Sequence, residues 1–443
     1  MTMTNSGFMK KNILFLLTLT MSVFSSCSQR RQNSESSSFD ADSALTYCHQ
    51  QVTRALEALQ PYDFTMMPRN ILAGETVWNC RKACPEEWCS GFWPGILWMD
   101  YVVQMKNGKG ENKELDSLRK VAEGYTEAIV PIINSQVYDH DLGFITINSF
   151  LKGYEATGND RYKQLALRAA DSLATLFNEK AGTILSWPRH VKDYGGHNTI
   201  MDNMMNLELL FWAGLTPNPI PEQSSPTRSL SPKGEGRKYL YDIAVRHAET
   251  TMKNQFREDG SCYHVAVYDT LDGHFIKGVT HQGYADSSMW CRGQSWAIYG
   301  YTMVYRFTKD KRFLDFAQKV TDIYLKRLHE TSDDWVPLWD MDAPAGAPKD
   351  ASAACVVASA LLELCQYVDK GKGNTYREAA ISMLRDLSTD RYQSRDKNVA
   401  FLMHSTGHHP AGSEIDSSII YADYYYIEAL LKYADIEYGA ASF

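Results

Sequence analysis

Residues 202–213 read DNMMNLELLFWA, and this stretch shows the pattern that dominates the chain. Its apolar residues recur at the spacing of an α-helix, and similar segments follow one another along the sequence. Convincing alternation of apolar and polar residues, which is typical of a half-buried strand, is almost absent. The sequence therefore predicts an all-α protein.

Twelve helices are expected, which pair into six hairpins. Turn-forming runs such as Gly158-Asn159-Asp160, Thr308-Lys309-Asp310 and Gly371-Lys372-Gly373-Asn374 separate consecutive segments. The expected helices cover residues 41–60, 91–107, 114–136, 142–157, 161–179, 200–214, 237–257, 289–308, 310–330, 351–370, 373–389 and 418–438.

Paired helices of this length can build a solenoid, a bundle or a closed double ring. No strict repeat of the solenoid kind is visible, which favours one closed α/α toroid whose loops meet at the end of a central cavity. The segment 217–236 is rich in proline, serine and basic residues, and it is expected to be an exposed insertion in this domain.

Composition excludes several classes of protein. With 443 residues, 44% of them hydrophobic, the chain can bury a large core. The net charge is −8 and no run of lysine or arginine could follow a nucleic-acid backbone, so nucleic acid is excluded as a partner. An anionic sugar remains possible, because a pocket responds to its local charge.

The first residues are typical of a bacterial export signal. Lys10 and Lys11 precede an apolar stretch at 13–24, and Ser25-Ser26-Cys27 resembles a lipoprotein cleavage site. We expect a signal peptide with a lipobox at 1–27, lipidation of Cys27, a tether at 28–40 and a single catalytic domain at 41–443. The protein would then be a monomer in the periplasm or at the outer membrane, and the lipid anchor would be its contact with the membrane. An ordinary signal peptide with an incidental cysteine is the alternative.

The other eight cysteines are scattered through the chain, unlike a disulfide scaffold. Cys80, Cys84 and Cys89 form a cluster, but they lack paired C-x-x-C spacing and a nearby histidine, so a zinc site is disfavoured. Core or loop cysteines are expected, with one disulfide left open. Nucleotide-binding, nucleophile-elbow and H-E-x-x-H motifs are also absent from the sequence.

Aromatic and polar residues gather between the expected helices. The runs are EWCSGFWPG at 87–95, YDHDLGF at 138–144, SWPRH at 186–190 and THQGYADSSMWCRGQSW at 280–296. Aromatic faces suit the apolar C–H faces of sugar rings, and histidine, glutamine and arginine can bind the hydroxyls. The composition of these runs favours carbohydrate chemistry that depends on carboxylates.

Taken together, these runs resemble glycoside hydrolase family 88, the unsaturated glucuronyl hydrolases. The resemblance covers nearly all of the chain after residue 40, through GFWPGILW at 91–98, HDLGF at 140–144, DNMMNLELLFWA at 202–213, HQGYADSSMWCRGQSWAIYGY at 281–301 and YADYYYIEALL at 421–431. It implies an (α/α)6 barrel, in agreement with the twelve expected helices.

The resemblance also implies the residues of the site. The catalytic aspartates would be Asp141 and Asp202, which are 61 residues apart. The implied substrate-binding residues are Trp93, His140, Trp187, His264, His281, Gln282, Trp290, Arg292 and Trp296. Aspartate is also a common helix N-cap, and both aspartates stand where a helix could begin, so capping is the competing interpretation.

The implied reaction is the hydration of the C4=C5 double bond of a terminal 4,5-unsaturated uronate, with Asp202 as general acid and base. We expect burial and a nearby negative charge to raise the pKa of Asp202. The substrate would come from a glycosaminoglycan, and no cofactor or metal is implied. The alternatives are an unsaturated rhamnogalacturonyl hydrolase of the related family 105 and a glycan-binding lipoprotein without activity.

Overall fold

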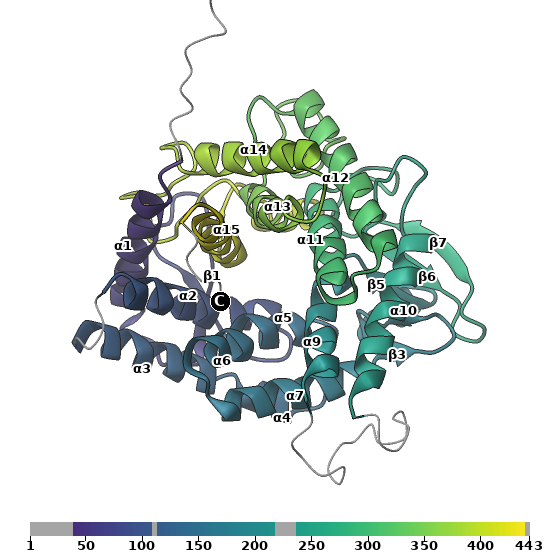
Figure 1. Ribbon diagram of the computed structural model, residues 1–443, viewed down its shortest axis with the longest axis horizontal. Helices are drawn as coiled ribbons and strands as arrows, with labels where there is room; N and C mark the ends of the chain where they lie inside the picture. Colours follow the sequence, from purple (N-terminus) through teal and green to yellow (C-terminus); the bar gives the residue numbers. More distant parts are fainter. Residues whose placement is uncertain (1–38, 109–112, 218–235, 439–443) are drawn as a thin grey trace, which may run out of the picture. The chain divides into compact units, whose positions relative to one another are not determined.

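The computed structural model describes residues 39–108, 113–217 and 236–438, and a compact unit begins at Ala41. In this unit an outer set of helices surrounds an inner set (Figure 1). The outer helices are α1 (Ala41–Leu59), α3 (Lys113–Glu127), α7 (Asp160–Ala174), α10 (Lys238–Asn254), α12 (Lys311–Thr331) and α14 (Lys370–Leu387). The inner helices are α2 (Phe92–Lys106), α5 (Leu142–Thr146), α9 (Asn203–Leu215), α11 (Cys291–Thr308), α13 (Ala351–Leu364) and α15 (Ile420–Tyr438). Helix α5 continues through the π-helix η2 (Ile147–Leu151) into α6 (Lys152–Thr157).

The distribution of apolar residues decides which helices lie inside. Every residue of α13 is buried, and its sequence, ASAACVVASALLEL, carries little charge. Helix α12 buries one face, on which residues such as Val320, Tyr324 and Leu328 recur every three or four positions, and it exposes its charged face. A helix that is apolar all round needs cover on all sides, whereas an amphipathic helix supplies that cover.

The inner helices contact one another in order, and α15 contacts α2, which closes the ring. Glycine permits one of these contacts. A Cβ on Gly91 would lie 2.4 Å from the carbonyl oxygen of Ile145, and a Cβ on Gly95 would lie 2.2 Å from that of Asn148. The motif GFWPG therefore lets α2 pack directly against the backbone of α5 and η2.

Local chemistry explains where two expected helices differ from the structure. The expected helix at 114–136 is divided into α3 and α4 (Val130–Asn134), because Pro131 has no N–H to donate to the carbonyl of Glu127. Helix α14 begins at Lys370 rather than residue 373, because the Asp369 side chain accepts from Gly371 N and Lys372 N and caps the helix.

Three small antiparallel sheets were not expected from the sequence. They are β1 (Met66–Ile71) with β2 (Asn79–Lys82) and β8 (Ser418–Ile419), β3 (Phe177–Asn178) with β4 (Thr183–Ile184), and β5 (His197–Ile200) with β6 (Val265–Tyr268) and β7 (Phe275–Val279). In the last sheet His197 pairs with Tyr268 and Ile200 with Val265. Strands this short produce almost no periodic signal, and β5 and β6 are buried throughout.

The remaining elements are short: η1 (Trp88–Gly91), η3 (Pro188–His190), α8 (Val191–Tyr194) and η4 (His409–Ala411). Within the described ranges all eight cysteines are free thiols, so the disulfide left open is not formed there. No helix in those ranges is both long and apolar enough to cross a bilayer. The signal peptide, Cys27, most of the tether and nearly all of the insertion at 217–236 lie outside the described residues.

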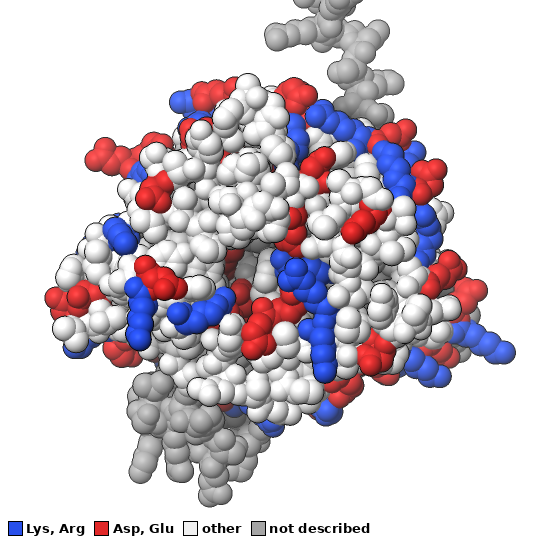
Figure 2. All heavy atoms as spheres, turned by 180° about the vertical axis from the view of Figure 1, so that it is seen from behind, with Lys and Arg blue, Asp and Glu red and all other residues white. Residues whose placement is uncertain are grey.

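Seen from behind Figure 1, the molecule is hollowed near its middle, and acidic and basic side chains surround the hollow (Figure 2).

The close contact between α2 and η2 yields a stability prediction. Gly95→Ala places a methyl group against Asn148 O and the Tyr424 ring, so it should lower the free energy of unfolding by about 1–3 kcal/mol, the usual cost of overpacking. Gly371→Ala, at an exposed position of α14, should change it by less than about 1 kcal/mol. Thermal melting of both variants tests this difference, and equal melting temperatures would contradict the proposed packing.

Candidate active site

A cavity of about 260 Å³ lies where the N-terminal ends of several inner helices meet the connecting loops. Asp141 directly precedes α5, Asp202 directly precedes α9, and Arg292 lies in the first turn of α11. The complete lining is Arg69, Arg81, Glu86, Trp88, Asp139, Asp141, Trp187, Arg189, Ile200, Asp202, His281, Gln282, Arg292, Gly407, His408, Ser413, Glu414 and Tyr421. Carboxylates, cations and aromatic rings therefore converge on one space.

Asp141 and Asp202 share this cavity although they are far apart in the sequence. Both occupy N-cap positions, but neither side chain makes a capping hydrogen bond. Their side chains are only 14% and 12% exposed, and they interact electrostatically. Capping, the competing interpretation of these aspartates, is therefore wrong, and both carboxylates are available for chemistry.

The two carboxyl groups have opposite electrostatic environments. Burial raises the pKa of Asp141 well above its usual range, and the charges of Asp139 and Asp202 raise it further. Burial also tends to raise the pKa of Asp202, but His264, His140 and Arg292 outweigh it and lower that pKa below its ordinary value. The raised pKa expected for Asp202 is thus found at Asp141 in the unliganded protein.

A buried histidine lies next to each of the two carboxyl groups. His140 Nε2 lies 3.5 Å from Asp141 Oδ1, and His264 Nε2 lies 3.6 Å from Asp202 Oδ2. Both imidazoles are almost completely buried, and neither is part of the cavity lining. Burial lowers the pKa of His140, so that ring is neutral near pH 7.

One wall of the cavity is built from flat rings. The centroid of Trp187 lies 4.9 Å from that of His281, which in turn lies 4.8 Å from that of His408. Tyr194 stacks on Trp187 and its hydroxyl lies 3.1 Å from His281 Nδ1. Burial and the neighbouring histidines lower the pKa of His281 to about 4, so the wall is uncharged at neutral pH and suits a sugar ring.

Arg292 has a stronger structural role than the sequence indicated. Its Nη1 donates to Asp350 Oδ2 at 2.5 Å and to Thr406 O at 2.6 Å, and its Nη2 donates to Gly407 O at 2.5 Å. Gln282 Nε2 donates to the same Gly407 carbonyl at 2.9 Å. Both side chains line the cavity and also fix the loop that carries His408.

The structure places the other expected binding residues differently. Trp290 packs against His264, and the centroids of the two rings are 4.3 Å apart. Trp93 and Trp296, like Trp290, are not among the residues that line the cavity, and their expected role in binding sugar stays a prediction. Trp93 points from α2 toward Tyr125, and Trp296 packs on Phe144 and Tyr425 inside the ring.

Sequence reasoning missed several residues of the lining. Trp88 stands in the same aromatic run as Trp93, but the turn η1 directs it into the cavity. Arg69 is buried on β1, where Nε and Nη2 donate to Glu414 at 2.7 and 2.9 Å and Nη1 donates to Glu87 at 2.9 Å. Arg69 and Glu414 are 345 positions apart in the sequence, so no local pattern could reveal that they pair. His408 also lines the cavity, whereas His409 stacks on Trp339.

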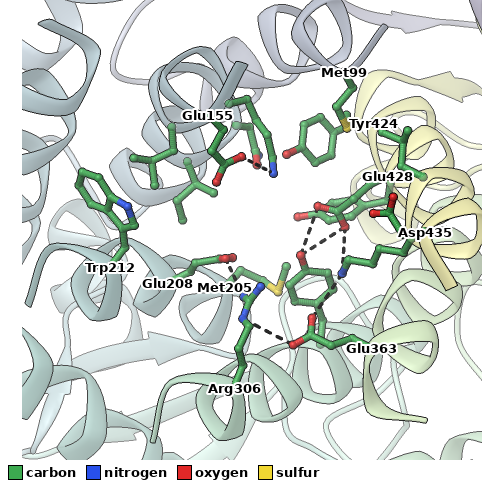
Figure 3. Close-up of a pocket in the computed structure, with 18 of the residues that line it drawn as sticks. Met99, Glu155, Met205, Glu208, Trp212, Arg306, Glu363, Tyr424, Glu428 and Asp435 are labelled. Atoms are coloured by element: carbon green, nitrogen blue, oxygen red, sulfur yellow. Dashed lines mark hydrogen bonds and ion pairs between the residues drawn. The ribbon is translucent and has the colours of Figure 1, made fainter. Parts of the chain in front are cut away.

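A second cavity, of about 530 Å³, shares no lining residue with the first. Charged side chains from the surrounding helices point toward its middle (Figure 3). Arg306 pairs with Glu208 at 2.7 Å and Glu363 at 3.5 Å, and Lys432 pairs with Glu363 and Glu428 at 3.5 and 3.7 Å. These ion pairs join α9, α11, α13 and α15, so this larger cavity has a structural explanation and contains neither catalytic candidate.

The fold and a cavity with two carboxyl groups and an aromatic wall are those of the class of carbohydrate-active enzymes. No protein-family model matches the chain. The chain is 38% identical over 379 residues to the unsaturated glucuronyl hydrolase of Formosa agariphila, covering 84% of this chain and 86% of that protein. It is 31% identical to the unsaturated chondroitin disaccharide hydrolase of Streptococcus pneumoniae, covering 78% and 82% of the two chains.

A solved structure of an unsaturated glucuronyl hydrolase specific for heparin superposes with a TM-score of 0.76 at 37% identity, covering 90% of this chain and 98% of that one. The chain belongs to the unsaturated glucuronyl hydrolase family and is a glycoside hydrolase. The expected (α/α)6 barrel is confirmed.

The raised pKa of Asp141 predicts a pH-dependent effect on stability. As pH rises above about 4, the unfolded chain ionises this carboxyl more readily than the folded protein does, because burial raises its pKa in the folded state, so stability falls. Asp141→Asn removes this loss and should stabilise the protein at pH 7 by about 0.5–2 kcal/mol, but not at pH 4. Thermal melting at both pH values tests this. Asp396→Asn, at an exposed site, controls for the loss of one carboxyl group. An Asp141→Asn variant that is less stable than the wild type at pH 7 would contradict the prediction.

Proposed function

We propose that this protein removes the terminal 4,5-unsaturated uronate from oligosaccharides that polysaccharide lyases release from glycosaminoglycans. The observation that carries the proposal is the pair Asp141 and Asp202, placed in one cavity from two inner helices. The cavity, at about 260 Å³, is smaller than the roughly 300–1,000 Å³ typical of sites for drug-sized ligands. Such a size suits an enzyme that admits one terminal ring and leaves the neighbouring sugar near the mouth.

The proposed reaction adds water across the double bond. Asp202 donates its proton to C4, the water oxygen bonds to C5, and Asp202 takes a proton from that water. The C5 hemiketal then opens to a ketone, and the resulting hemiacetal at C1 releases the neighbouring sugar. This route differs from ordinary glycosidases, whose two carboxylates act at the anomeric carbon.

Substrate binding supplies the proton state that Asp202 needs. In the unliganded cavity Asp202 is the more acidic member of the pair. A bound uronate brings another negative charge and excludes water, and both changes raise the pKa of a carboxyl group. Because the two aspartates are electrostatically coupled, their protonation is a joint property, and Asp141 is the charge partner and positioning group once the shared proton is on Asp202.

The relatives support a glycosaminoglycan source. One of them is named for unsaturated chondroitin disaccharides and another is described as specific for heparin. The cavity carries four arginines, Arg69, Arg81, Arg189 and Arg292, although the whole chain is net negative. The same lining also carries five carboxyl groups, those of Glu86, Asp139, Asp141, Asp202 and Glu414, so the arginines supply cations that a uronate carboxylate can meet without making the cavity positive as a whole.

Loss of ultraviolet absorbance tests the activity directly, because hydration destroys the conjugated double bond. Wild-type protein should abolish the absorbance of unsaturated chondroitin or heparin disaccharides, and Asp202→Asn should lower kcat by about 10²-fold or more. Ulvan, hyaluronan and pectin lyase products belong in the same panel.

If only the pectin products react, the family 105 activity is correct instead. If wild-type protein binds the disaccharides but every product keeps its absorbance, the protein is a glycan-binding protein and the proposed activity is wrong.

The cellular location stays a prediction from the sequence. We propose that Cys27 is lipidated and that the enzyme acts as a monomer in the periplasm or at the outer membrane.

A further inference from the structure

The histidines behind the catalytic aspartates each have one buried nitrogen without a hydrogen bond. These atoms are His140 Nε2 and His264 Nε2, which lie 3.5 and 3.6 Å from the nearest oxygens of Asp141 and Asp202. A neutral imidazole carries one proton, and its position decides whether these nitrogens are donors or acceptors. The other ring nitrogen of each histidine settles that question.

Asn206, on the first turns of α9, contacts the other nitrogen of His140. Its Oδ1 accepts from the backbone N–H of Phe144 at 2.7 Å, and this contact requires the oxygen at that position. The Nδ2 group therefore lies 3.0 Å from His140 Nδ1. An NH₂ group can only donate, so His140 Nδ1 is the acceptor and the ring proton is on Nε2.

His264 reaches the same state by a different route. Its Nδ1 accepts from two backbone N–H groups, those of His281 and Gln282, both at 3.2 Å. Backbone amides cannot act as acceptors here through their nitrogen, so the proton of a neutral His264 is again on Nε2. Two N–H groups thus face the two carboxylates.

The backbone around Asn206 is arranged for this contact. A Cβ on Gly143 would lie 2.3 Å from Asn206 Oδ1, so any other residue at 143 would displace the amide. Helix α5 and helix α9 approach closely at this point, and the amide bridges them.

We propose that Asn206 is a positioning residue that holds His140 in its Nε2-protonated form, so that His140 and His264 present matched N–H donors to Asp141 and Asp202. The opposite tautomer would turn a lone pair toward Asp141, so His140 could only accept a hydrogen bond from the protonated acid and could not donate one to the carboxylate. Metal-ligating histidines are oriented in the same way by partners that fix their tautomer. The inference rests on the proposed function only in that it assigns Asn206 a role at that site.

Asn206→Asp tests the role of the amide. The variant keeps the shape and still accepts from Phe144 N–H, but its second oxygen now requires a proton on His140 Nδ1. We expect kcat to fall by about 10–100-fold, as for other groups that fix a catalytic tautomer, with KM changed by less than about threefold. The acidic limb of the pH profile should also shift, because the new carboxylate favours a charged His140.

Asn148→Asp is the matched control, because Asn148 is also buried, on η2, but makes no hydrogen bond to a histidine of the described ranges. It should keep the wild-type pH profile. If both variants shift the profile alike, buried charge alone explains the effect and the proposal fails.

The wild-type protein provides a test that needs neither folding of a variant nor activity. Nitrogen-15 NMR of histidine-labelled protein reports which ring nitrogen carries the proton, and His140→Gln identifies the signals of His140. We expect an unprotonated Nδ1 and a protonated Nε2 at His140 near pH 7. A protonated Nδ1 in the wild type would overturn the proposal even if the enzyme hydrates unsaturated uronates as proposed.

Discussion

The close approach of α5 and α9 at Gly143 and Asn206 is the constraint on which the active site depends. Asp141 precedes one of these helices and Asp202 precedes the other, so the distance between the helices sets the relation of the two carboxylates. The Asn206 side chain joins the helices through Phe144 N and His140 Nδ1. Packing of the barrel and placement of the two carboxyl groups are therefore consequences of the same contact.

The two ends of the barrel have different roles. At the end where the helices begin, carboxylates without capping bonds face a small cavity with neutral imidazoles. Around the second cavity, Arg306 and Lys432 join four inner helices through paired charges. Arg306 and Lys432 are 32% and 22% exposed, so water screens these pairs in part, and each pair contributes less than a fully buried one would. The ion pairs hold the ring together, and the N-terminal ends remain available for chemistry.

The sequence was sufficient for the helical architecture because long helices leave a strong periodic signal. All twelve expected segments contain a helix, and their errors lie at the ends, as at Pro131 and Asp369. The helix expected at 161–179 ends at Ala174, because residues 177–178 form strand β3. The small sheets were missed because strands of two to six residues carry little pattern.

The site was predictable where a motif stands next to a helix start, as at Asp141 and Asp202. Position in a motif did not distinguish Trp88, which faces the cavity, from Trp93, which packs against α3. Contacts between distant segments, such as Arg69 with Glu414, and the pKa order of the aspartates depend on three-dimensional surroundings that the sequence does not display.

The central claim is that the carboxylate pair hydrates a double bond instead of attacking the anomeric carbon. Turnover of an unsaturated disaccharide in D₂O, followed by NMR at C4 of the released uronate at early times, tests it most directly. The account predicts one deuteron bonded to C4 for each sugar released and a keto group at C5. Release of the sugar with the C4=C5 bond intact and no deuterium at C4 would contradict it.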